Sequence, residues 1–89
     1  PSFVNIATNK MISIILNDPR IDVNLGNIKL ERSPLFMASK ANNLEVVKLL
    51  LSFKDIKINK SDKFGYSPLL IASLQGHHQI VEELLKMEE

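Results

Sequence analysis

The stretch SPLFMAS at residues 33–39 decides the fold, because it returns as SPLLIAS at residues 67–73, 34 positions later. The similarity continues downstream at the same spacing, where VVKLLL at 46–51 matches IVEELL at 80–85. A shift of 35 in the other direction reaches a third version of this apolar pattern, MISIIL at 11–16. Such a period is typical of repeat proteins, in which each unit stacks on the next.

The second and third copies each carry the signals of two short helices. The Ser-Pro pairs predict helix starts, because serine can accept from an early backbone N–H and proline lacks a donor that would have no partner there. Asn42 and Gly76 come next, and these residue types most readily adopt the left-handed conformation that ends a helix. A second helix then carries an apolar stripe that needs a neighbour. The stripe comprises Val46, Val47, Leu50 and Leu51 in one copy, and Ile80, Val81, Leu84 and Leu85 in the next.

The segments that follow the helix pairs have a different period. IDVN at 21–24 and IKIN at 56–59 lie 35 positions apart, and each alternates apolar and polar residues before an asparagine. The polar run KSDKFGY at 60–66 predicts a hairpin-like projection, which we call a finger. We therefore divide the single domain, residues 1–89, into a partial first repeat at 1–26, a second repeat at 27–60 and a third at 61–89.

This order of helix, turn, helix and finger resembles the ankyrin repeat, a unit of about 33 residues with a T-P-L-H-x-A signature. The resemblance covers essentially the whole chain and implies an all-α solenoid of stacked helix-turn-helix units with hairpin-like finger loops. The third copy matches the pattern best, at Asn59, Asp62, Gly65, Ser67, Pro68, Leu69, Ala72, Gly76, His77, Ile80, Val81, Leu84 and Leu85.

Several positions depart from the family pattern. Phe36 and Leu70 stand where the family has histidine, so we expect the polar contact of that histidine to be either absent or replaced by packing. The first finger, residues 25–32, has Ile28 and Glu31 in place of the aspartate and glycine of the second finger.

The two ends of the repeat array differ from its middle. Alignment puts Phe3 at the conserved alanine position, so the first copy is either a cap or a truncated unit. Leu84 and Leu85 have no following repeat, so we expect a fraying end or a missing neighbour. A chain extended past Glu89 is then expected to melt at a higher temperature.

Charge and composition exclude several classes of protein. The 11 basic and 10 acidic residues nearly cancel, which argues against nucleic acid as a partner. Apolar runs fall far short of the roughly 20 residues that a membrane span needs. With no cysteine there is neither a disulfide nor a thiolate site, and we expect an intracellular, cytoplasmic location.

The clusters of histidine, glutamate and glycine in the sequence do not match known catalytic, metal-binding or phosphate-binding motifs. His77 and His78 are adjacent on a helix and diverge too far to chelate one metal, and Glu82 and Glu83 lie on a solvated face. The three glycines do not form a phosphate-binding loop, so we expect no catalysis, cofactor or metal. One basic patch, Lys54, Lys57, Lys60 and Lys63 beside Phe64 and Tyr66, could be a solvated finger or a surface for phosphate or bases.

The resemblance implies a surface as the functional site, because partner-binding positions of ankyrin arrays cluster on the fingers and first helices of the concave side. We expect a monomer that binds a protein partner and no small-molecule substrate, with Arg32, Phe64 and Tyr66 as preferred anchors. The alternative is a structural or regulatory spacer that positions a neighbouring domain. The expected partner-binding residues are Lys29, Leu30, Arg32, Lys40, Ala41, Ser61, Lys63, Phe64, Tyr66, Leu74 and Gln75.

Overall fold

The structure is a computed structural model that describes residues 10, 14–15, 17–26 and 29–87. It contains the helices α2 (Pro34–Lys40), α3 (Leu44–Leu51), α4 (Pro68–Leu74) and α5 (His78–Lys86), and these described residues include no strand. The expected all-α architecture is confirmed. The expectations about Phe3, Ile28 and most of the helix at 11–16 concern residues outside the described ones.

The helices begin and end where the sequence signals stand. Ser33 Oγ accepts from the N–H of Phe36 at 3.2 Å, and Ser67 Oγ accepts from the N–H of Leu70 at 3.1 Å. After these helices the chain turns through positive φ angles, 59° at Asn42 and 74° at Gly76. Both helix starts and both helix ends were therefore readable from residue type.

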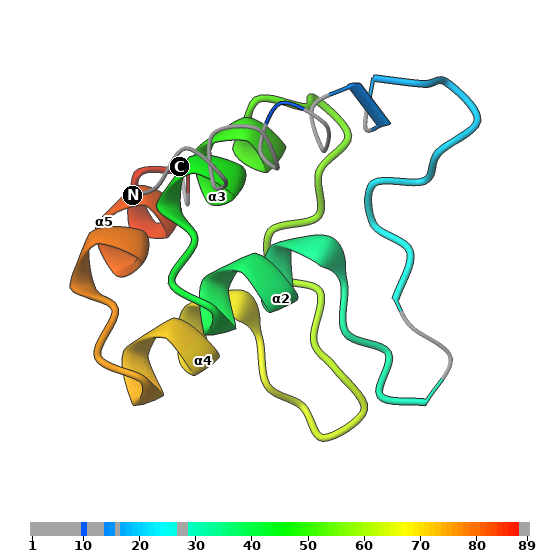
Figure 1. The fold of residues 1–89 in the computed structure, drawn as a ribbon. Coiled ribbons are helices and arrows are strands. Elements are labelled where there is room, and N and C mark those ends of the chain that lie inside the picture. The colour runs from blue at the N-terminus through cyan, green and yellow to red at the C-terminus, as the bar shows by residue number, and fades with distance from the viewer. Residues whose placement is uncertain (1–9, 11–13, 16, 27–28, 88–89) are drawn as a thin grey trace.

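The four helices form two layers. Figure 1 shows α3 beside α5 in one layer and α2 beside α4 in the other. The apolar stripe of α3 is buried along its whole length, and the matching stripe of α5 is buried at Ile80 and Leu84 but exposed at Leu85. The core cluster comprises Val23, Leu35, Ala38, Val46, Val47, Leu50, Leu51, Ala72, Ile80 and Leu84.

Polar contacts between neighbouring repeats fix how the units stack. The amide of Asn24 donates from Nδ2 to the carbonyl oxygen of Asp55 at 2.9 Å and accepts at Oδ1 from the N–H of Lys57 at 2.8 Å. His77 Nδ1 lies 3.1 Å from the carbonyl oxygen of Ser39, to which it donates. Each contact joins a side chain to the backbone of the adjacent repeat, so the repeats are held at a fixed offset.

Candidate protein-binding surface

The second finger is shaped by the buried carboxylate of Asp62. Its Oδ1 accepts from the backbone N–H groups of Phe64 and Tyr66, each at 2.9 Å. The backbone closes the same turn, because the N–H of Asp62 donates to the carbonyl of Tyr66 at 2.9 Å. Gly65 supplies the left-handed conformation at the turn, with φ 89°. This internal scaffold leaves the side chains of Lys63 and Phe64 projecting into solvent.

The environment of Asp62 keeps its side chain ionised. Burial alone would raise the pKa of the carboxyl, but the N–H groups of Tyr66 and Phe64 and the Arg32 guanidinium together outweigh burial. The pKa of Asp62 is therefore held below its usual value, and the finger retains a full negative charge at its base near neutral pH.

Arg32 connects the two fingers. Its Nε lies 3.4 Å from Oδ2 of Asp62, and its guanidinium carbon lies 5.0 Å from the centre of the Phe36 ring, a cation–π arrangement. Phe36 itself is fully buried, so packing does take the place of the family histidine at this position. The Arg32 side chain is only 22% exposed, which makes it part of the scaffold as well as a predicted anchor.

A backbone contact also joins the fingers. The N–H of Lys63 donates to the carbonyl of Leu30 at 2.8 Å. Lys63 therefore lies against the residue that follows Lys29, which brings the backbones of these two lysines close together on adjacent fingers. Figure 1 shows the second finger and residues 29–32 of the first finger extending past α2 and α4, to the lower right of the view.

We call the eleven residues predicted for partner binding the inner surface. The structure leaves nine of them exposed and two, Leu30 and Arg32, partly buried. At the C-terminal ends of α2 and α4 the exposed pairs are Lys40 with Ala41 and Leu74 with Gln75, and these two helices pack against each other. The predicted residues thus come together on two adjacent repeats.

Sequence reasoning missed two contributors to this region. Met37 is 46% exposed and lies three and four residues before Lys40 and Ala41, so it shares their face of α2. Its counterpart Ile71 is buried, so no repeat signal marked the methionine. Asp62 was recognised as a match to the family pattern, but its role in shaping the finger depends on backbone geometry.

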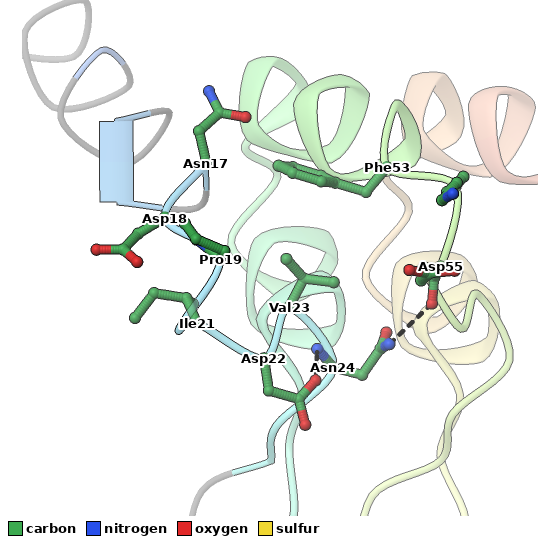
Figure 2. Close-up of a pocket in the computed structure, with 10 residues that line it drawn as sticks. Asn17, Asp18, Pro19, Ile21, Asp22, Val23, Asn24, Phe53 and Asp55 are labelled. Carbon is green, nitrogen blue, oxygen red and sulfur yellow. Dashed lines mark hydrogen bonds between the residues drawn. The ribbon is translucent and has the colours of Figure 1, made fainter.

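A separate pocket of about 370 Å³ lies between the connectors of the first two repeats (Figure 2). Val23 points toward the Phe53 ring, and the amide of Asn24 is already used by the neighbouring connector. The carboxylate of Asp18 forms an ion pair with Arg20, in which Nη2 of Arg20 lies 2.6 Å from Oδ2 of Asp18. The Asn24 amide thus stabilises the junction of the repeats and the Asp18 carboxylate pairs within its own connector, so both groups already have partners inside the chain.

The described residues show no sign of a metal centre or of a membrane span. They contain no group of three or more histidine, cysteine, aspartate or glutamate side chains that could hold a metal ion. Across residues 29–87 and the described N-terminal part, no helix combines the length and apolar character needed to cross a bilayer.

Comparison with known proteins agrees with the repeat pattern. A family model described as ankyrin repeats (3 copies) matches residues 4–89. The chain belongs to the ankyrin repeat family. Ankyrin repeats are generally non-catalytic modules for protein–protein interaction.

Several curated proteins are similar to this chain. Ankyrin repeat-containing protein ITN1 of Arabidopsis thaliana is 37% identical over 87 residues, which cover 86% of this chain and 15% of that protein. BTB/POZ domain-containing protein 3 of Schizosaccharomyces pombe is 47% identical over 49 residues, 55% of this chain and 9% of that protein. Human ankyrin repeat domain-containing protein 49 is 40% identical over 60 residues, 64% of this chain and 25% of that protein. The chain thus spans a quarter or less of the length of these relatives.

Proposed function

We propose that this ankyrin domain is a non-catalytic module that binds a partner protein through its inner surface. The observation that carries the proposal is the linked pair of fingers, in which Arg32 and Asp62 hold the scaffold while Phe64 and Tyr66 remain exposed. A surface that is already rigid loses less conformational entropy when it binds. Aromatic side chains on such a scaffold are favourable anchors for a protein interface.

The proposal is tested by selecting binders from a phage library of protein fragments, with the folded chain immobilised. Phe64→Ala and Tyr66→Ala are expected to weaken a selected binder by about tenfold or more, as for central interface residues. Lys48→Ala is the matched control, because Lys48 is exposed on α3, in the other helix layer. Equal affinity for all three variants would contradict the assignment of the inner surface.

The alternative is a spacer that positions a neighbouring domain of a larger protein. The exposed apolar residues on the far side of the third repeat, Leu85 and Met87, favour it because they are available for packing against a neighbour. The spacer hypothesis predicts that Leu85→Glu disrupts the arrangement of the longer protein, while Phe64→Ala does not. Small-angle scattering of a longer chain carrying each substitution separates the two functions.

A further inference from the structure

The inner surface carries unpaired positive charge. Lys29, Lys40 and Lys63 are exposed, and none forms an ion pair with a carboxylate of the described residues. The negative charge of Asp62 is buried and lies against Arg32, so these two groups largely cancel. Glu31 is the acidic residue exposed beside the lysines, which leaves three unpaired positive charges against one.

The arrangement of this charge is set by the backbone. Lys29 and Lys63 occupy the same position of successive fingers, and the hydrogen bond from Lys63 N–H to the Leu30 carbonyl keeps those fingers adjacent. Lys40 lies at the end of α2. The fingers therefore contribute two neighbouring positive charges, and Lys40 adds a third at the other end of α2, about 10 Å along the helix from Ser33. This local excess exists although the whole chain has a net charge of only +1.

Apolar side chains lie on the same surface. Phe64 is 64% exposed and Leu74 is 62% exposed, with Tyr66 and Met37 also open to solvent. A ligand that matches this surface needs carboxylates for the lysines and apolar groups for these residues. Phe64 and Tyr66 offer rings on which bases could stack, but nucleic acid leaves Leu74 and Met37 unmatched, because these side chains have no flat ring. The Arg32 guanidinium is also engaged by Asp62.

We propose that the inner surface recognises an acidic segment of its partner protein, in which aspartate or glutamate residues are interspersed with apolar side chains. This inference rests on the proposed function and adds the chemistry of the partner. Electrostatic attraction then speeds association and orients the segment, while burial of Phe64 and Leu74 slows its release. Because the lysines are exposed, salt is expected to weaken binding.

The test is a random peptide library displayed on phage, selected against the whole 89-residue chain at low ionic strength. The enriched peptides are expected to be net negative and to contain apolar residues. A synthetic copy of one enriched peptide should bind Lys63→Glu and Lys29→Glu about tenfold more weakly than the unchanged chain. Lys48→Glu on α3 is the control for net charge and should bind as the unchanged chain does, and circular dichroism verifies that every variant is folded.

The possible outcomes separate the two proposals. If the enriched peptides are neutral or basic, the acidic segment is overturned. If Phe64→Ala still weakens the binding of those peptides, the inner surface remains the binding site. If neither Phe64→Ala nor Lys63→Glu weakens peptide binding, both the inner surface and the acidic segment are overturned. If no peptide is enriched, the acidic segment is overturned. If polyuridylate binds more tightly than the peptides and Lys63→Glu abolishes that binding, the acidic segment is overturned and single-stranded nucleic acid is the ligand class.

Discussion

Matching residues of the second and third repeats have different surroundings. Leu51 is 9% exposed, whereas its counterpart Leu85 is 52% exposed. Phe36 is fully buried, whereas Leu70 at the same position of the next repeat is 42% exposed. The sequence patterns are nearly the same, so the difference comes from what lies alongside. A repeat in this chain buries its stripe against its successor, and the third repeat has no described successor.

Matched polar residues of successive repeats also differ in their surroundings. Asn24 joins two backbone groups of the following connector, whereas the side chain of Asn59 has no hydrogen-bond partner among residues 29–87. Ser39 is buried and its carbonyl accepts from His77, whereas Ser73 is exposed. Interfaces between repeats, as well as the repeats themselves, therefore determine stability.

The largest effect is expected from shortening matched leucines. Leu51→Ala removes buried methyl groups and leaves a cavity, and should lower the free energy of unfolding by about 2–3 kcal/mol. Leu85→Ala, at a half-exposed site, should lower it by less than about 1 kcal/mol. Urea denaturation followed by circular dichroism measures both, and similar losses would show that the contrast in burial has no energetic meaning.

A smaller difference is expected for the matched asparagines. Asn24→Ala removes two hydrogen bonds between repeats and should cost about 1 kcal/mol of unfolding free energy. Asn59→Ala should change it by no more than about 0.5 kcal/mol. Asn24→Asp sharpens the comparison, because it keeps the acceptor for Lys57 and loses the donor to Asp55. If Asn24→Asp is as stable as the unchanged chain, the contact with Asp55 contributes nothing.

The two fingers differ in backbone strain. Glu31 has φ 58° at the position where the second finger has Gly65. Because side chains disfavour this conformation, Glu31→Gly should stabilise the chain by about 0.5 kcal/mol after the entropy cost of glycine. Asn42→Gly is the control, since asparagine tolerates φ 59° and should gain less. Thermal denaturation compares the variants, and a larger gain for Asn42→Gly would contradict strain at Glu31.

The smallest effect is confined to acid pH. Since the folded pKa of Asp62 lies below its unfolded value, its contribution to stability is fully present above about pH 5 and is lost as pH falls through the lowered pKa. Asp62→Asn cannot titrate, so its stability should fall less steeply between about pH 5 and pH 3. Urea midpoints measured across this range test the prediction, and parallel curves for the two proteins would argue against it.

Much of the fold was predictable because its signals are local. Ser33 and Ser67 cap helices through neighbouring backbone groups, and Asn42 and Gly76 end helices through their own φ angles. The stripe of α3 follows from helical spacing alone. Such features need no knowledge of distant residues, so a single repeat reveals them.

The exposure of the residues proposed for partner binding was predictable, but the contacts that shape the fingers were not. The eleven residues of the inner surface came from matching repeats, and most are exposed as expected. The engagement of Arg32 by Asp62 could not be predicted, because it joins residues 30 positions apart through a bend of the finger. The exposure of Met37 was missed for a similar reason, since helical spacing does not tell which face a neighbouring repeat covers.

The amide of Asn24 acts toward the next connector as an inserted peptide group would, with one donor and one acceptor for backbone atoms. Backbone atoms are the same whatever side chains the connector carries. This contact therefore places almost no demand on the sequence of the unit that follows. Gene duplication or exchange could lengthen such an array, while the exposed finger residues diverge to suit new ligands.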